Sequence, residues 1–103
     1  MIAIRISVGA YEDLGEAFNF YERQEPGLGE YFRSCLNNDI EGLKITAGIH
    51  LQTFRDYHRL LSRVFPYAVH YTLAANEVTV WAVVDCRRHP DWITDRLSRS
   101  TLS

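Results

Sequence analysis

The chain has 103 residues, of which 47% are hydrophobic and 23% charged, so it suits one globular domain and excludes a disordered or fibrous protein. No apolar run approaches the roughly 20 residues that a membrane-spanning helix needs, and the first five residues do not begin a signal peptide. The two cysteines have neither metal-site nor disulfide-framework spacing. We therefore expect a cytoplasmic protein with no membrane contact.

The formal net charge of −2 conceals an uneven distribution. Residues 1–54 hold four basic and eight acidic side chains, whereas residues 55–103 hold seven basic and five acidic ones. All seven basic residues of the second part are arginines, which pair with carboxylate or phosphate in a bidentate manner. The sequence pI of about 6.0 is too low for a general nucleic-acid binder, so any anion contact must be local.

Residues 2–8 alternate large apolar side chains with smaller or polar ones, which predicts a strand with one buried face that ends at Gly9. Residues 11–24 then follow a period near 3.6 and predict an amphipathic helix. Three acids fall on the expected solvated face of this helix: Glu12, Asp13 and Glu16.

A second helix is predicted over residues 29–47, with Gly48 as its C-terminal cap. Pro26 and Gly27 separate it from the first helix. Because this connection is short, the two helices are expected to form an antiparallel hairpin.

The remaining sequence is rich in β-forming residues. Pro66 and the pair Ala75–Asn76 mark the turns between strands, and Pro90 suits the first position of a short final helix. The predicted elements are strands at residues 58–65, 67–73 and 77–86 and a helix at residues 90–99. This order predicts one α+β domain spanning residues 1–103, in which an N-terminal strand and a helical hairpin pack with an antiparallel β-sheet and a short C-terminal helix follows.

Arg59 and Arg63 lie four residues apart in one predicted strand, so they are expected to point to the same face, together with Leu61 and Phe65. This face is interpreted either as a cationic strip that engages phosphates or an acidic partner, or as an ordinary solvated sheet face. The spacing alone leaves both interpretations open.

Arg87, Arg88, His89 and Pro90 directly follow the most apolar strand. Two adjacent cations, a titratable histidine and a turn fixed by proline are typical of an anion site at a strand end. The alternative is an exposed charged loop in which His89 only bridges to Asp91 or Asp95.

Three further histidines, His50, His58 and His70, have no metal-motif spacing with a carboxylate, so no metal is expected. We interpret the strand residue His70 as structural. No glycine-rich phosphate loop and no serine- or cysteine-centred nucleophile motif is present, and no cofactor is expected.

Four segments, in this order along the chain, resemble the toxins of the RelE/ParE superfamily, which belong to bacterial type II toxin–antitoxin pairs and include plasmid stabilisation proteins. The segments are Asp13–Glu22 in the first helix, Gln24–Phe32 with its Pro-Gly-Leu-Gly stretch, His58–Tyr71 with an Arg and then Phe-Pro-Tyr, and Ala82–Trp92. This resemblance implies the α+β fold predicted above. It also implies a cognate antitoxin, whose amphipathic helix would lie in the groove between the helical hairpin and the sheet.

Members of this superfamily differ in activity, so the resemblance implies two possible targets. RelE-like members are mRNA interferases that cut mRNA on the ribosome, whereas ParE-like members are gyrase inhibitors. In a RelE-like protein the catalytic residues would be Arg59, Arg63, Arg87, Arg88 and His89. In either case the surface that binds the target or antitoxin would hold Arg59, Arg63, Arg87, Arg88 and Trp92.

The sequence departs from the RelE-like pattern in three respects. No Tyr follows Tyr71, Lys44 is the only lysine, and His89 precedes the last helix instead of lying in a C-terminal tail. We therefore favour a ParE-like protein that acts on DNA gyrase. The alternatives are a RelE-like endoribonuclease that acts on the ribosome and mRNA, and an inactive toxin that serves only as a binding module.

Overall fold

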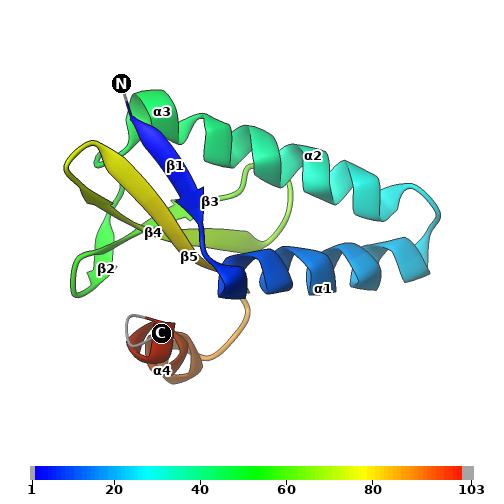
Figure 1. Cartoon of the computed structure of the whole chain (residues 1–103). Coiled ribbons are helices and arrows are strands. Elements are labelled where there is room, and N and C mark those ends of the chain that lie inside the picture. Colours follow the sequence, from blue (N-terminus) through cyan, green and yellow to red (C-terminus); the bar gives the residue numbers. More distant parts are fainter. Residues whose placement is uncertain (1, 101–103) are drawn as a thin grey trace.

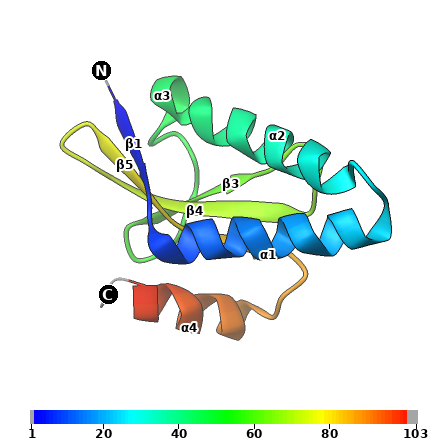
Figure 2. The same ribbon diagram turned by 45° about the vertical axis from the view of Figure 1, so that its right-hand side comes forward.

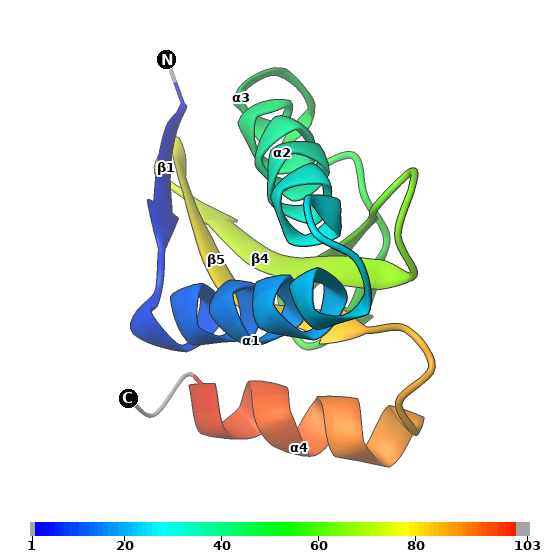
Figure 3. The same ribbon diagram turned by 90° about the vertical axis from the view of Figure 1, so that its right-hand side faces the viewer.

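The computed structural model describes residues 2–100, which form a five-stranded sheet with helices on both faces (Figure 1). A hairpin of two helices covers one face and the last helix covers the other (Figures 1 and 3). The elements are β1 (Ala3–Ile6), α1 (Val8–Gln24), α2 (Leu28–Glu41), α3 (Leu43–Thr46), β2 (Gln52–Phe54), β3 (Tyr57–Leu61), β4 (Tyr67–Ala74), β5 (Glu77–Asp85) and α4 (Pro90–Ser100).

The strand order is β1-β5-β4-β3-β2. The pairs from β5 to β2 are antiparallel, whereas β1 pairs with β5 in parallel, so the sheet is mixed. The predicted α+β class, the helical hairpin and the short final helix are confirmed. The parallel pair arises because the hairpin of α1 and α2 separates β1 from the rest of the sheet in sequence.

A bulge in β5 changes which of its side chains point to each face of the sheet. His70 pairs with Ala82 but the next residue, Tyr71, pairs with Val80, so Trp81 is the extra residue. Before the bulge Val80 faces the helical hairpin, whereas after it Ala82 faces α4. The alternation of side chains is therefore reversed at this point, and the second half of β5 is buried on both sides.

The hairpin face holds the larger core, which is dominated by aromatic rings. Phe32 is fully buried, and its ring centroid lies 5.2 Å from that of Tyr21 and 5.1 Å from those of Phe65 and Tyr67. The core on the α4 face is smaller and consists of Tyr57, Ala82, Val84 and Leu97. These contacts join α1, α2 and the sheet into one body.

The first strand is shorter than predicted, and Gly9 does not end it. Ser7 ends the strand because its side chain accepts a hydrogen bond from the Ala10 amide at 3.1 Å and caps α1. Helix α1 therefore begins at Val8, and Gly9 lies inside its first turn. The apolar side chain of Val8, which continued the strand pattern, is 76% exposed at the start of the helix.

The second predicted helix is divided at Gly42 into α2 and the single turn of α3, and the positive φ of Gly48 (96°) follows α3. The N-terminus of α2 is capped from α1. The Glu22 carboxylate accepts hydrogen bonds from the amides of Gly27 and Gly29 at about 3.0 Å. A Cβ atom on Gly29 would lie 2.6 Å from the Phe18 carbonyl oxygen, so this crossing of the helices requires glycine.

The strand predicted at residues 58–65 corresponds to β3, but its predicted C-terminal end lies four residues too late. Strand β3 ends at Leu61, because the Ser62 amide bonds the Tyr67 carbonyl and closes a loop over residues 62–66. The short strand β2 was not predicted, because it has three residues and joins β3 through Arg55, whose φ is 51°. The turn at Ala75–Asn76 is confirmed, with φ values of 51° and 62° that suit a type I′ hairpin.

Helix α4 lies beside α1, on the opposite side from α2 (Figures 2 and 3). Leu97 of α4 is fully buried against the sheet, and the Tyr57 hydroxyl donates a hydrogen bond to the Leu97 carbonyl at 3.0 Å. Within residues 2–100 no helix has the length and apolar character that a membrane span requires.

Candidate functional site

A cavity of about 400 Å³ lies between α4 and the sheet face formed by β3, β4 and β5. We call it the sheet–α4 groove. Arg59 enters it from β3, Arg88 from the segment after β5, and His70 forms part of its lining from β4. The register explains this grouping, since Arg59 pairs directly with His70 across the β3–β4 ladder.

The two arginines of the sheet–α4 groove are not neutralised by carboxylates. Arg59 makes no ion pair among residues 2–100. The guanidinium carbon of Arg88 lies 4.4 Å from the centroid of the Trp92 ring, so its described partner is an aromatic face. The groove therefore presents two guanidinium groups that form no ion pair among the described residues.

His70 is 1% exposed, and neither ring nitrogen has a hydrogen-bond partner among the described residues. Burial, and to a smaller extent the positive charges of Arg59 and Arg96, together lower the pKa of His70 to about 4. The ring is therefore neutral at pH 7. A buried imidazole with both nitrogens unpaired costs free energy, because each lost hydrogen bond to water is not replaced.

The structure separates the other residues predicted for the site. Arg63 lies outside β3 in the loop over residues 62–66, so it does not share a strand face with Arg59. Its Nε is 3.3 Å from Oδ1 of Asp39 on α2. Phe65 joins the aromatic core on the hairpin face, and only Leu61 shares the groove with Arg59. The predicted cationic strip of Arg59 and Arg63 is therefore wrong.

Arg87 and His89 are engaged locally. Arg87 pairs with Asp85 through Nε and Nη2, at 2.9 Å and 2.6 Å, and this hydrogen bonding raises the pKa of Arg87. The exposed His89 accepts a hydrogen bond from the Asp91 amide at 3.0 Å through Nδ1. The same Nδ1 lies 3.8 Å from Oδ2 of Asp91, which is one of the two acids named in the alternative interpretation of His89.

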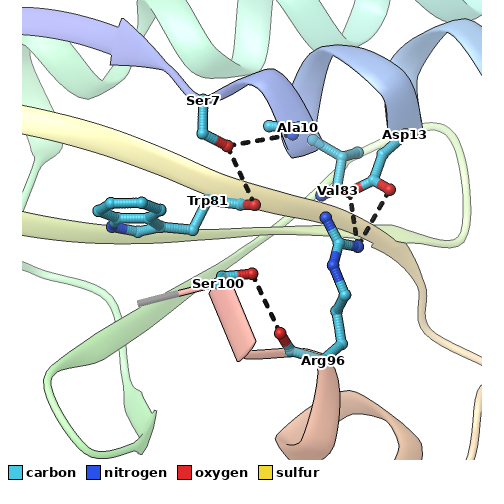
Figure 4. A network of polar contacts seen from close by, with 7 residues as sticks. All are labelled: Ser7, Ala10, Asp13, Trp81, Val83, Arg96 and Ser100. Carbon is cyan, nitrogen blue, oxygen red and sulfur yellow. Dashed lines mark hydrogen bonds and ion pairs between the residues drawn. The ribbon is translucent and has the colours of Figure 1, made fainter. Parts of the chain in front are cut away.

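A second cavity, of about 310 Å³, lies between α1 and α4 and is lined by Phe20, Trp92 and Arg88. At its base Arg96 of α4 bonds the Asp13 carboxylate of α1 at 3.0 Å (Figure 4). Both side chains are less than a fifth exposed. The interpretation of Asp13 as a solvated residue is therefore wrong, whereas Glu12 and Glu16 are exposed as predicted.

Asp13 has a structural reason to be buried. Strand β1 ends at Ile6 and leaves one edge of the second half of β5 without a neighbouring strand, while β4 pairs with the other edge. There the Asp13 carboxylate accepts a hydrogen bond from the Val83 amide at 2.9 Å, and the Ser7 hydroxyl donates to the Trp81 carbonyl at 3.2 Å (Figure 4). Burial raises the pKa of Asp13, and the bonds from Val83 and Arg96 only partly oppose this rise.

Two hollows, of about 540 and 520 Å³, share Ile6, Tyr11 and Asn37 in their walls. The first lies between β1 and α2, as the groove expected between the hairpin and the sheet would, whereas the second lies between α1 and α2. We call them together the hairpin groove. Tyr11 is 63% exposed, and Arg33 and Lys44 stand at its walls. No three His, Cys, Asp or Glu side chains within residues 2–100 are grouped to hold a metal ion.

No family model matches the chain, and neither does any curated protein. Among solved structures, a chain described as "Chromosomal ParDE TA system from P. aeruginosa" is similar, with a TM-score of 0.76. The similarity covers 82% of this chain and 96% of that chain, at 12% sequence identity. The chain has the fold of this ParDE protein. The α+β fold that the resemblance implied is therefore confirmed.

Sequence reasoning missed His70 and Cys86 as part of the sheet–α4 groove. The signal for His70 was its place on an antiparallel ladder opposite Arg59, which requires the register to be known. Cys86 is exposed. Partial desolvation of its thiol raises the pKa of Cys86, so the thiol is not activated as a nucleophile. Because Cys86 lines the sheet–α4 groove, the alkylation rate of its thiol can report whether the groove is occupied.

Proposed function

We propose that this chain is the toxin of a type II toxin–antitoxin pair, that it is ParE-like, and that it acts on DNA gyrase in the cytoplasm. Two observations support the toxin assignment. The fold is shared with a chain of a ParDE system, and the ordered motifs from Asp13 to Trp92 resemble RelE/ParE toxins. A cognate antitoxin is the partner that this proposal requires.

One observation favours gyrase over mRNA as the target. Cutting RNA needs several charged groups and an acid or base around one phosphate. Of the five residues that would supply them, only Arg59 and Arg88 line a common groove. Arg63 is paired with Asp39, Arg87 with Asp85, and His89 with the start of α4. A toxin that acts by binding, not as an enzyme, fits this separation.

We assign the target contact to the surface that carries Arg59, Arg88 and Trp92. Arginine and tryptophan are the residues that most often dominate protein interfaces, and here both arginine charges are free of carboxylates. We assign the antitoxin's amphipathic helix to the hairpin groove, where Tyr11 is exposed beside Ile6. The excess of arginine in the second part of the chain favours an acidic antitoxin.

The test is a DNA supercoiling assay with purified gyrase and purified protein, scored for cleaved DNA. We expect cleaved DNA to accumulate, and Arg59→Ala combined with Arg88→Ala to reduce it about tenfold or more. Arg99→Ala is the matched control, because Arg99 is exposed and pairs only with Asp95 on α4. Normal supercoiling with no cleaved DNA would contradict the proposal.

A RelE-like endoribonuclease is the second candidate, because Arg59 and Arg88 are unpaired beside the neutral ring of His70. Toeprinting of an mRNA on ribosomes distinguishes it, since new 5′ ends inside the message would appear only with an RNA-cutting toxin. A protein with no effect on gyrase or on translation that still binds its antitoxin would be the inactive binding module.

A further inference from the structure

The sheet–α4 groove combines features that a contact surface for a large partner does not explain. Its walls are largely apolar, with Leu61 and Ala68 on the sheet side and Ile93 and Leu97 on α4. Leu61 is 53% exposed, so this apolar surface remains accessible from outside. A cavity of about 400 Å³ is of the size that small-molecule sites have.

The charges of the groove lie among these apolar walls. Arg59 and Arg88 line it and have no carboxylate partner among the described residues. Of the eight arginines elsewhere in residues 2–100, six are paired with acids: Arg5, Arg33, Arg63, Arg87, Arg96 and Arg99. The groove therefore attracts an anion, and its walls attract an apolar group attached to that anion.

His70 is the second, independent observation. It is 1% exposed, it contributes to the lining of the groove, and both of its ring nitrogens are without a partner. Buried polar side chains almost always have a hydrogen-bond partner. A polar atom that enters from the groove would supply the missing bond, since His70 in its neutral form offers one donor and one acceptor.

We propose that the sheet–α4 groove is a binding site for a small amphipathic carboxylate, with the carboxylate at Arg59 and His70 and the apolar body between Ile93 and Leu61. Arg88 closes the outer end of the site as a second cation. This site is additional to the proposed action on gyrase. Binding is measured on the protein alone, so failure of the gyrase proposal and failure of this one are distinguishable.

The experiment is titration of the purified chain with octanoate, followed by calorimetry and by the NMR signals of the His70 ring. We expect saturable 1:1 binding and a shift of the His70 signals. The uncharged analogue, 1-octanol, should bind about tenfold more weakly or not at all, because its hydroxyl cannot form a bidentate ion pair with Arg59. Cys86, on the groove wall, supplies a third readout. In a Cys35→Ser background, octanoate should slow its alkylation.

Variants separate the site from nonspecific apolar binding. Arg59→Gln should weaken octanoate binding about tenfold, whereas Arg99→Gln, outside the groove, should leave it unchanged. Folding of each variant is checked by circular dichroism. Equal affinity for octanoate and 1-octanol, equal affinity in Arg59→Gln, or a saturable complex that leaves the His70 and Cys86 readouts unmoved would each overturn the proposal.

Discussion

The two faces of the sheet differ in how completely their polar groups are satisfied. On the hairpin face, aromatic rings fill the core and the Glu22 carboxylate caps α2 through the amides of Gly27 and Gly29. One buried side-chain oxygen of the hairpin, Oδ2 of Asp39, has no hydrogen-bond partner among the described residues, although Oδ1 of the same carboxylate bonds Arg63. On the α4 face the core is small, the His70 ring has no partner, and Arg59 has no counter-ion among the described residues. The difference indicates that the hairpin face contributes most of the folding stability. The α4 face leaves polar groups unsatisfied, which lowers stability and is common at binding surfaces.

The largest effect is expected on the hairpin face. Phe32→Ala should lower the free energy of unfolding by about 3–5 kcal/mol, because it removes a fully buried ring that contacts three others. Urea denaturation followed by circular dichroism measures the change. Tyr11→Ala, at a ring that is 63% exposed, is the control and should change stability by less than about 1 kcal/mol. A similar loss in both variants would contradict this assignment of the core.

The α4 face should be sensitive to acid through His70. Its pKa of about 4 in the folded protein lies below the ordinary histidine value of 6.5, so as the pH falls the unfolded chain takes up the proton first. Stability is therefore fully present above pH 6.5 and is lost as the pH falls toward 4, by about 3 kcal/mol from this one group.

His70→Leu should remove this component, which urea denaturation at pH 7.5 and at pH 4 would measure in both proteins. At pH 7.5 the variant should be at least as stable as the wild type, because Leu leaves no unpaired nitrogens in the site. An identical loss of stability on acidification in the two proteins would show that other groups account for it.

The connection between the faces is tested at Asp13. Asp13→Ala should cost about 2 kcal/mol, because it leaves the Val83 amide and the Arg96 guanidinium without their acceptor. Hydrogen exchange should become faster at Val83 and along α4. Glu12→Ala, on the exposed side of the same helix, is the control. Unchanged exchange at Val83 would show that the carboxylate does not protect this edge.

The smallest effect is expected from Glu22→Gln, which retains one acceptor oxygen but loses the negative charge at the N-terminus of α2. The expected cost is about 1 kcal/mol. Thermal unfolding measured at low and high salt checks the cause, because screening should narrow the difference between the two proteins. A difference that is independent of salt would point to altered packing instead of charge.

The order and type of the main elements were predictable because the apolar period changes from 2 to 3.6 and back at the correct places. The boundaries were less predictable. Val8 extends the strand pattern of residues 2–6, yet the hydrogen bond between the Ser7 side chain and the Ala10 amide starts a helix there. Arg63 follows the strand pattern as well, but the bond from Ser62 to Tyr67 ends the strand before it.

The candidate site was predictable only in part. Arg59 and Arg88 were identified from local patterns, and the structure places both at the sheet–α4 groove. Asp13 was assigned to solvent because helical periodicity does not reveal that β5 has an open edge beside it. The unpaired state of His70 depends on the bulge at Trp81 and on the packing of α4, both of which are tertiary features.

The way in which α1 completes β5 has a consequence for self-association. An unpaired strand edge is a template for intermolecular pairing, and β5 is the longest strand of the sheet. Ser7 and Asp13 occupy hydrogen-bonding groups on its open half with side-chain oxygens, so no strand from another molecule can add there. Among residues 2–100, open edges remain only on β1 and β2, which are four and three residues long. A helix thus protects the sheet from aggregation where the chain has no further strand to add.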